Sequence, residues 1–357
     1  IGNFGSMKTE KMEADSIYTG HLPKGCVMCR KGAKLVLLVS GRCDSGCFYC
    51  PLSSKKKGKD VIYADEKLAS SDEDIIFEAE SIDAEGTGIT GGDPVKSLDR
   101  TIYYIELLKN HFGKKHHIHL YTASLDTDAY SRLEKAGLDE LRIHPPVERW
   151  GELPELEDFI KNTKMSIGFE IPAIPGKEKE IRDLVKFGEK AGLDFINLNE
   201  LEFSEGNWDE LEKRGFSAKD EISSAVGGSE ELAYEIIKTA KMPVHYCSSS
   251  FKDAVQLRQR LKRRALKTSL PSDIITEDGT LLKGVVEGDP DKIIETLKNE
   301  FEVPEELMHF DKEKERIEVA PWILEEIFED LPYDSFIVEE YPTADRLEVE
   351  REPLKRH

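Results

Sequence analysis

The stretch KLVLLVSGRCDSGCFYC, residues 34–50, places three cysteines directly after an apolar run. The run 34–40 is typical of a buried strand, and the cysteines follow it at the spacing C-x3-C-x2-C. Three thiolates from one loop can hold three irons of a cubic 4Fe-4S cluster, and Gly46 lets the backbone wrap around it. The fourth iron then lacks a protein ligand and can bind an external chelator. The alternatives are a zinc site, which usually takes four ligands from paired motifs, or buried structural cysteines.

Strand-like and helix-like segments alternate along the chain after this stretch. Most apolar runs are bounded by glycine or proline, and several of the helical segments between them open on Ser or Asp. Six strands separated by helices imply right-handed crossovers and a parallel sheet. We therefore predict an α/β fold, a partial (β/α)6 TIM-like barrel that is closed or nearly closed. The predicted strands are 34–40, 86–92, 117–123, 140–146, 166–173 and 195–202, and a seventh short run follows at 242–249.

The length of 357 residues is enough for one large domain and a smaller unit. Residues 1–6 precede Met7 and are interpreted as a cloning remnant. The expected divisions are an N-terminal extension with a Cys-x2-Cys motif (7–34), the partial barrel (35–250), a basic amphipathic helix as linker (251–272) and a small α+β domain (273–357).

The charge balance restricts the partners that the chain can bind. It carries 50 Lys and Arg against 71 Asp and Glu, which gives a net charge of -21. Such a surface repels phosphate, so a nucleic-acid role would require a local basic patch. The sequence has no apolar run long enough for a membrane span and no signal-peptide pattern, so we expect a soluble cytoplasmic protein. In a reducing cytoplasm, six cysteines indicate metal ligands or catalytic thiols rather than disulfides.

The motif CDSGCFYC, followed by TGGDP at residues 90–94, resembles the radical S-adenosylmethionine enzymes, with a barrel like that of pyruvate formate-lyase activating enzyme. The resemblance extends over about residues 34–203. It implies that Cys43, Cys47 and Cys50 bind a 4Fe-4S cluster whose open iron is chelated by S-adenosylmethionine. It also implies reductive cleavage to a 5'-deoxyadenosyl radical that abstracts hydrogen from a substrate. The electron would come from a reductant protein such as ferredoxin or flavodoxin.

The resemblance also implies cofactor contacts near the cluster. Tyr49 would lie against the adenine. The stretch of Gly91, Gly92, Asp93 and Pro94 would receive the methionine amino group through its backbone. Asp93 stands where the family usually has glutamate.

Two further segments at strand ends are candidates for cofactor binding. Ser124 and Asp126 follow the third predicted strand and suit the ribose or methionine of the cofactor, with a helix N-cap as the competing role for Asp126. Ile171 lies in a segment that resembles the family's fifth strand, and the resemblance implies contact with adenine. Strand alternation can send its neighbour Glu170 outward.

The sixth predicted strand carries polar residues at alternate positions. Asn197 and Asn199 point the same way, which places both amides toward the barrel interior, and Glu200 and Glu202 follow at its mouth. We expect these four residues to contact the substrate, with an exposed surface as the alternative. His144 ends the fourth strand, where a packed, hydrogen-bonded role is expected. No catalytic residue is identified.

The segment KGCVMCRKG has the shape of a metal knuckle formed by Cys26 and Cys29. Cys247 is the remaining cysteine that can join them, with His245 and His21 as further donors. A second 4Fe-4S cluster on the three cysteines and a zinc site completed by histidine are both possible, as are free thiols without metal. Cys29 should lie near the N-terminal rim of the barrel. Cys247 can reach it only if the seventh run ends near that rim or the intervening chain crosses the open side.

Three functions remain open from the sequence. The enzyme could act on a small molecule or peptide with help from an auxiliary cluster. It could instead modify RNA, such as transfer RNA, held by basic residues, although a solvated helix face or salt bridges would also account for those residues. The third function is a non-catalytic iron-sulfur or electron-transfer protein. The basic residues in question are Arg260, Arg263, Arg264 and Lys267, with Lys55, Lys56 and Lys57.

Overall fold

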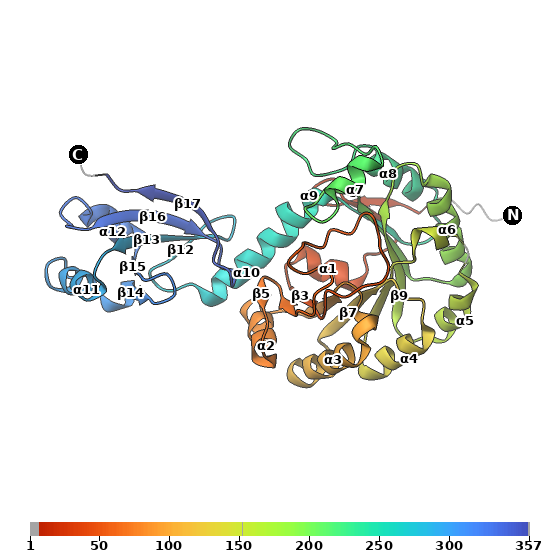
Figure 1. Cartoon of the computed structure of the whole chain (residues 1–357), viewed down its shortest axis with the longest axis horizontal. Helices are drawn as coiled ribbons and strands as arrows, with labels where there is room; N and C mark the ends of the chain where they lie inside the picture. The colour runs from red at the N-terminus through yellow and green to blue at the C-terminus, as the bar shows by residue number, and fades with distance from the viewer. Residues whose placement is uncertain (1–6, 152, 356–357) are drawn as a thin grey trace. The chain divides into compact units, whose positions relative to one another are not determined.

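The structure is a computed structural model that describes residues 7–151 and 153–355. The chain forms two compact units (Figure 1). The first unit comprises the chain up to residue 80 together with 84–257, and the second comprises 81–83 and the chain from 258 onward. The interpretation of residues 1–6 falls outside the described residues. The domain boundaries expected at 34, 250 and 272 remain predictions.

The first unit is built on seven parallel strands that lie side by side in chain order. All seven apolar runs predicted as strands are strands, because each is a short β-branched or leucine-rich segment between turn residues. The strands are β3 (Lys34–Leu38), β6 (Gly86–Thr90), β7 (His117–Thr122), β8 (Glu140–Ile143), β9 (Ser166–Ala173), β10 (Phe195–Glu200) and β11 (Val244–Cys247).

The sheet is open. Beyond β11 it continues through two short antiparallel strands, and beyond β3 through two more, so that eleven strands form one path with an edge at each end. The α/β class is therefore as predicted, and the barrel is partial, without closure. The added strands are β2 (Ile17–Thr19) and β1 (Thr9–Lys11) at one end and β4 (Tyr63–Ala64) and β5 (Lys67–Leu68) at the other.

Helices cover the outer face of this curved sheet (Figure 1). The strand residues that face them are apolar and fully buried, among them Leu35, Leu37 and Ile89. Within the part of the chain that is described, no helix has the length and apolar character needed to cross a bilayer. The covering helices are α2 (Asp72–Ser81), α3 (Leu98–Phe112), α4 (Thr127–Ala136), α5 (Pro154–Asn162), α6 (Glu178–Ala191) and α8 (Ser229–Thr239).

The second unit is an antiparallel sheet packed on helices. Its strands follow the order β14-β15-β13-β16-β17, with β12 paired to β13. Val286, Ile293 and Ile317 lie in its apolar core. The strands are β12 (Ile274–Ile275), β13 (Leu281–Glu287), β14 (Met308–Asp311), β15 (Arg316–Val319), β16 (Asp334–Glu340) and β17 (Glu348–Pro353), and the helices are α10 (Arg258–Thr268), α11 (Pro290–Asn299) and α12 (Pro321–Ile327).

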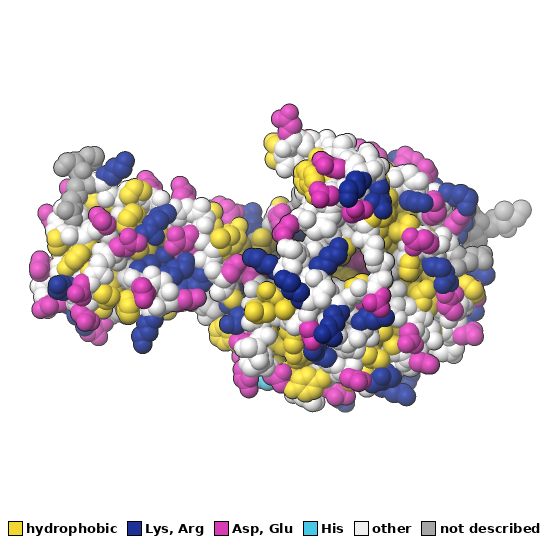
Figure 2. All heavy atoms as spheres, in the orientation of Figure 1, with side chains coloured by type: hydrophobic (Ala, Val, Ile, Leu, Met, Phe, Trp, Pro, Cys, Tyr) yellow, Lys and Arg dark blue, Asp and Glu magenta, His cyan; other side chains and the backbone are white. Residues whose placement is uncertain are grey.

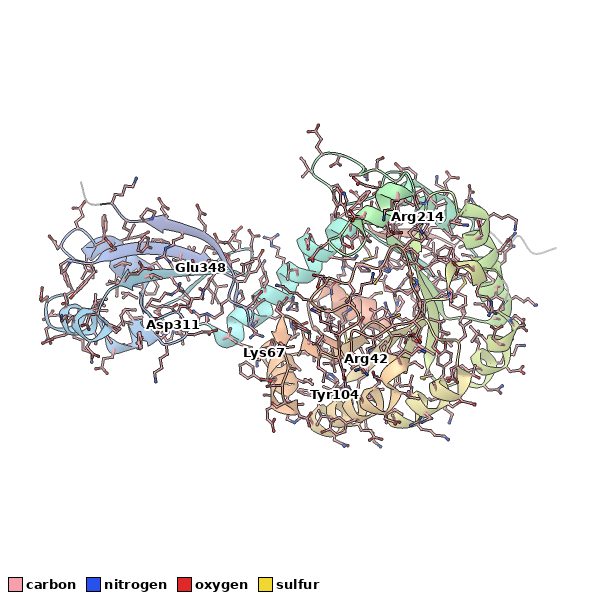
Figure 3. The ribbon with its side chains drawn as sticks, viewed as in Figure 1. Arg42, Lys67, Tyr104, Arg214, Asp311 and Glu348 are labelled. Carbon is pink, nitrogen blue, oxygen red and sulfur yellow. The ribbon has the colours of Figure 1, made fainter. Side chains whose placement is uncertain are left out.

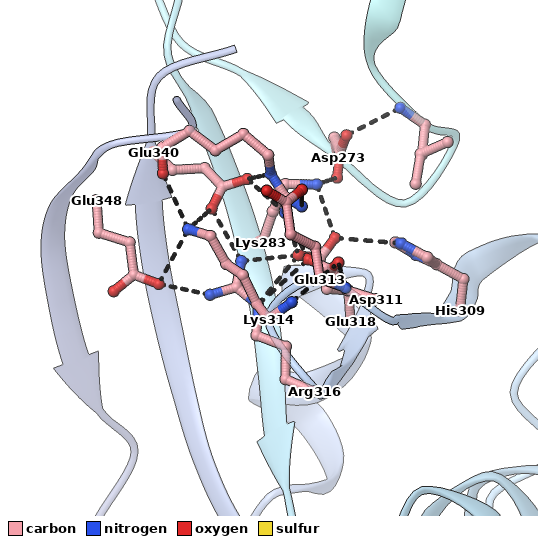
Figure 4. A network of polar contacts seen from close by, with 12 residues as sticks. Asp273, Lys283, His309, Asp311, Glu313, Lys314, Arg316, Glu318, Glu340 and Glu348 are labelled. Atoms are coloured by element: carbon pink, nitrogen blue, oxygen red, sulfur yellow. Dashed lines mark hydrogen bonds and ion pairs between the residues drawn. The ribbon is translucent and has the colours of Figure 1, made fainter. Parts of the chain in front are cut away.

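The second unit also contains a buried network of ion pairs (Figure 4). The Lys283 ammonium lies 2.8 Å from Glu318, and the Arg316 guanidinium lies 2.7 Å from Glu318 and 2.9 Å from Glu340. Arg346 joins through Glu340. Apart from Arg346, these side chains are almost fully buried. Each charge therefore depends on its partners in the network.

We predict that the second unit loses stability in acid. Burial alone would raise the pKa of Asp311, but its hydrogen bond and ion pair with Arg346 outweigh burial and hold that pKa well below its usual range. The same balance lowers the pKa of Glu340. A carboxyl group whose pKa is lowered in the folded state stabilises the fold at pH values above its unfolded pKa of about 4. This stabilisation is lost as the pH falls below that value. Urea unfolding followed through the methyl resonances of Val285 should show midpoints that decrease between about pH 4 and pH 2, and equal midpoints at pH 7 and pH 3 would contradict this.

Candidate metal and cofactor site

The three clustered cysteines lie on one closed loop, which we call the thiolate loop, residues 41–59. Its neck is closed by two backbone hydrogen bonds, from Gly41 N–H to Lys59 O and from Gly58 N–H to Gly41 O, both 2.8 Å. The loop leaves the carboxyl end of β3, where parallel barrels place their chemistry. Cys43 is exposed, whereas Cys47 and Cys50 are partly buried.

Glycines let the thiolate loop rest directly on backbone. A Cβ atom on Gly41 would lie 1.7 Å from the Lys56 carbonyl oxygen, and one on Gly92 would lie 2.3 Å from the Arg42 carbonyl oxygen. A Cβ on Gly91 would be 2.5 Å from a carbonyl oxygen of the residue just before the loop. The glycines that were predicted to approach the cofactor are therefore also the residues that seat the cysteines on the strand ends.

Asp93 ties two strand ends together beneath the loop. Its buried carboxylate accepts hydrogen bonds from the Thr122 hydroxyl at 2.7 Å and from the Ala123 amide at 3.2 Å, and it caps the short 3-10 helix that starts at Pro94. The aspartate thus fixes the backbone that follows β6. This use of its carboxylate is compatible with a cofactor contact through the backbone of the same stretch.

Asp126 takes the N-cap role that was one of its two predicted uses. Its carboxylate accepts from the amides of Asp128 and Ala129 at the start of α4. Ser124 lies between β7 and this cap, and its hydroxyl accepts from the Asp126 amide at 3.2 Å. Both side chains therefore hold the backbone between β7 and α4.

Tyr49 anchors the thiolate loop to the sheet. Its hydroxyl lies 2.6 Å from His144 Nε2, and His144 Nδ1 lies 2.6 Å from the backbone carbonyl of Glu170, so Nδ1 donates and Nε2 accepts. Burial raises the pKa of Tyr49 and lowers that of His144, which keeps both neutral. The packed, hydrogen-bonded role expected for His144 is confirmed.

A second anchor of the loop includes Arg214, which Figure 3 labels together with Arg42 on the loop. Phe48 stacks on Phe216 with ring centroids 6.4 Å apart, and the Arg214 guanidinium lies 4.4 Å from the centre of the Phe48 ring. Arg42 stands on the loop and pairs with Asp60. The thiolate loop is therefore fixed by side chains on both sides of its cysteines.

Cations collect around the cysteines even though the whole chain is acidic. Figure 2 shows Lys and Arg side chains near a hollow on the visible face of the first unit. Within the thiolate loop, the Ser45 amide also donates to the Cys43 sulfur at 3.4 Å. The donor set fits a cubic iron-sulfur cluster, whose sulfurs accept hydrogen bonds from backbone amides. The exposed cations of the loop are Arg42, Lys55, Lys57 and Lys59.

The Cys-x2-Cys motif, which was predicted to form a metal knuckle, lies on a helix. Helix α1 (Lys24–Arg30) packs against β3, β6 and β7 on the inner side of the curved sheet (Figure 1). The Gly25 amide donates to the Glu140 carboxylate at 3.2 Å, and a Cβ at Gly25 would meet the Arg142 guanidinium at 2.6 Å. Cys26 and Cys29 are three residues apart, so their side chains share one face of the helix.

The inner face of the sheet is polar and its charges are paired. Arg142 is 2% exposed and binds Glu140 at 2.5 Å, Glu170 at 2.9 Å and the Cys26 sulfur at 3.4 Å. Glu170 also accepts from the amides of Asn197 at 2.8 Å and Asn199 at 2.9 Å. Burial alone would raise the pKa of Glu170, but Arg142 and the two amides lower it. The predicted common direction of Asn197 and Asn199 is confirmed.

Glu170 points to the inner face of the sheet, and its neighbour Ile171 points the other way. Because side chains alternate along β9, Ile171 lies on the opposite face, where it is 1% exposed and part of the apolar core. The adenine contact of Ile171 remains a prediction.

Cys247 lies on the inner face of the sheet, toward which α1 packs. It stands opposite Asn199 in the register of β10 and β11, and Asn197, next along the same face, donates to the Cys26 sulfur at 3.4 Å. Burial raises the pKa of Cys247, and the neighbouring thiols of Cys26 and Cys29 raise it further. Helix α1 packs on the inner side of the sheet, and a shared site for Cys26, Cys29 and Cys247 remains a prediction.

Glu200 and Glu202 are both occupied by the chain that follows β11. Glu200 accepts from the amide and the hydroxyl of Ser249 at 2.8 and 3.0 Å, and Glu202 pairs with Lys252. Across residues 7–151 and 153–355, no three His, Cys, Asp or Glu side chains converge closely enough to hold a single metal ion.

A comparison with known proteins finds a relative that matches nearly the whole chain. The chain is 43% identical over 354 residues, covering 93% of each chain, to a protein of Methanocaldococcus jannaschii named "Putative glycyl-radical enzyme activating enzyme". Residues 279–354 match the family described as "Domain of unknown function (DUF8061)". The chain therefore belongs to the same family as the M. jannaschii protein, a family of radical S-adenosylmethionine enzymes. Membership implies an enzyme with a 4Fe-4S cluster, S-adenosylmethionine and a reductant.

We predict that Gly41→Ala weakens metal binding by the thiolate loop. The added Cβ would overlap the Lys56 carbonyl and open the neck, at a cost of at least about 1–3 kcal/mol. After anaerobic reconstitution and gel filtration, the variant should retain clearly less iron than the wild type. Gly227→Ala is the control, because its Cβ would have no neighbour closer than 3.8 Å. Equal iron in both variants would show that the neck does not hold the cysteines in place.

Proposed function

We propose that this chain cleaves S-adenosylmethionine reductively at the thiolate loop and abstracts a hydrogen atom from a partner molecule. The observation that carries the proposal is the set of Cys43, Cys47 and Cys50 on one closed loop, seated on the glycines that end β6. When bound, the cluster and cofactor would supply the electron transfer that yields a 5'-deoxyadenosyl radical. A loop with three thiols leaves one iron for the cofactor.

The residues around the loop would position the cofactor. The backbone of Gly91, Gly92, Asp93 and Pro94 lies beside the loop neck and is fixed by the Asp93 carboxylate. We propose that this backbone receives the methionine amino group. Ser124 and Asp126 hold the next strand end, and Tyr49 would contact the cofactor with its ring while its hydroxyl binds His144.

We propose that the hydrogen comes from a glycine of a partner protein. This proposal rests on the name of the M. jannaschii relative, which is similar to this chain over nearly its whole length. A small molecule or peptide in the same position is the alternative, with Asn197, Asn199, Glu200 and Glu202 as the proposed contacts. Hydrogen bonds and an ion pair within the protein already occupy these four side chains. A substrate would have to replace those interactions.

The exposed cations of the thiolate loop favour an acidic electron donor of the ferredoxin or flavodoxin kind. They form a local positive patch on a chain of net charge -21, which would steer an acidic protein toward the cysteines.

The RNA alternative is less well supported. Arg263 donates to the carbonyl of Ile82, and Arg264 is buried and donates to the carbonyl of Pro342. Internal carbonyls therefore occupy two of the basic side chains on which RNA binding would depend. A non-catalytic electron carrier is likewise less consistent with membership in an enzyme family.

We also propose that Cys26, Cys29 and Cys247 hold a second metal group, either an iron-sulfur cluster or zinc. Asn197 supports a shared site for these cysteines, because its amide contacts the Cys26 sulfur and Asn199, on the same face of β10, lies opposite Cys247.

We predict that the reconstituted protein, reduced with dithionite, releases 5'-deoxyadenosine from S-adenosylmethionine. Cys47→Ala should lower this release to the background of a protein-free sample, because the cluster loses one of its three thiolates. Lys186→Ala, on an exposed position of α6, should match the wild type. Liquid chromatography of the products measures the outcome. Release that persists in Cys47→Ala would place the chemistry elsewhere.

A further inference from the structure

A buried cation contacts one of the three inner cysteines directly, and two lysines interact electrostatically with the others. The Arg142 guanidinium donates to the Cys26 sulfur at 3.4 Å and is itself buried. Lys34, 6% exposed at the start of β3, is the charged neighbour of Cys29. Arg142 favours the Cys26 thiolate, but burial outweighs it and raises the pKa of this thiol to about 11. Metal binding would therefore release a proton from Cys26.

The charge of Lys252, which pairs with Glu202, acts against the burial that raises the pKa of Cys247. Lys252 lies in a π-helical segment, Lys252–Leu257, that follows β11 and contacts α1. Single turns of π-helix are frequent at functional sites. The segment brings a cation to the one inner cysteine that α1 does not supply.

A buried histidine next to these cysteines has a free nitrogen. His245 is 3% exposed and lies opposite Asn197 in the register of β10 and β11. Its Nδ1 is 3.3 Å from Asn197 Oδ1, while the Asn197 amide nitrogen donates to Glu170 and to the Cys26 sulfur. The Glu170 carboxylate can only accept hydrogen bonds, so the Asn197 nitrogen must point toward Glu170 and the Asn197 oxygen toward His245. His245 Nδ1 must therefore donate to that oxygen.

His245 Nε2 consequently carries a lone pair and has no hydrogen-bond partner among the described residues. An unpaired polar nitrogen in the interior is costly. A histidine whose Nδ1–H is held by an amide oxygen, with Nε2 free, has the arrangement that metal-binding histidines usually show.

We propose that the barrel interior binds a second iron-sulfur cluster, held by Cys26, Cys29 and Cys247 with His245 Nε2 as the fourth protein ligand. This deepens the second metal group of the proposed function and is independent of the radical chemistry. Since no iron is left open, this inner cluster does not offer the external binding position that the thiolate loop offers.

The spacing of the donors favours a cluster over zinc. A zinc ion needs four donors within about 2.0–2.3 Å of one point, whereas a cubic cluster spreads its ligands over four irons. The four donors come from α1 and β11, and within the described ranges no three His, Cys, Asp or Glu side chains converge closely enough to hold a single ion.

The inner cluster would fasten α1 inside the sheet. Helix α1 has seven residues, too few to be stable alone in water. Bonds from Cys26 and Cys29 to a metal group shared with β11 would add binding free energy to the packing around Arg142, because metal binding is coupled to folding.

The test isolates the inner site by removing the outer one. A variant carrying Cys43→Ala, Cys47→Ala and Cys50→Ala should still bind about four irons and four sulfides per chain after reconstitution, against about eight in the wild type. Adding Cys247→Ala should remove the remaining iron. An outer-site variant that folds like the wild type by circular dichroism but holds no iron, or holds one zinc ion, would overturn the proposal.

The fourth ligand is tested by pulsed electron paramagnetic resonance of the reduced outer-site variant. We expect a nitrogen hyperfine coupling that disappears in His245→Ala, while His245→Cys keeps the iron without this coupling. His119→Ala is the matched control, because His119 is equally buried and both of its ring nitrogens lack a partner among the described residues. Loss of the coupling in His119→Ala instead would overturn the assignment of His245. Intact inner iron with no cleavage of S-adenosylmethionine in the wild type would contradict only the proposed function.

Discussion

The close approach of backbone to backbone at the carboxyl ends of β3 and β6 is the constraint on which the cofactor site depends. Glycine at positions 41, 91 and 92 allows it, since a Cβ atom at any of them would overlap a carbonyl oxygen. These close approaches therefore fix the position of the thiolate loop on the sheet. Tyr49 and Phe48 fix it from the sides through His144 and Phe216. Cysteines on a loop with this support are held in place before a metal arrives, which lowers the cost of ordering them on binding.

A second constraint acts inside the barrel, where Arg142 is buried. A guanidinium without solvent needs anionic partners, and Glu140 and Glu170 provide them from its own strand and the next one. The same arginine reaches Cys26, so the charge network that stabilises the inner face also organises the inner cysteines. The outer and inner sites thus differ in kind. The cysteines of the thiolate loop lie on a glycine-seated loop at the strand ends, whereas Cys26 lies within a buried polar network.

Much of the first unit could be predicted from the sequence because its signals are local. Short apolar runs bounded by turn residues gave all seven parallel strands, and the spacing of the cysteines identified the thiolate loop. The position of α1 could not be predicted, because it depends on the buried polar side chains that line the sheet. The sequence also did not decide which face of β9 points inward, because a shift of one residue in register would exchange the positions of Ile171 and Glu170. Strands β14 and β15 were also missed, because charged residues hide their alternation.

The central claim is that the thiolate loop holds a cluster with one iron left for S-adenosylmethionine. An anomalous-scattering map at the iron edge, measured on crystals grown with the cofactor, tests it most directly. The account predicts iron density at Cys43, Cys47 and Cys50, with one iron bound by the amino and carboxylate groups of the cofactor. Iron density whose every ligand is a protein side chain, with the cofactor absent or bound elsewhere, would contradict it.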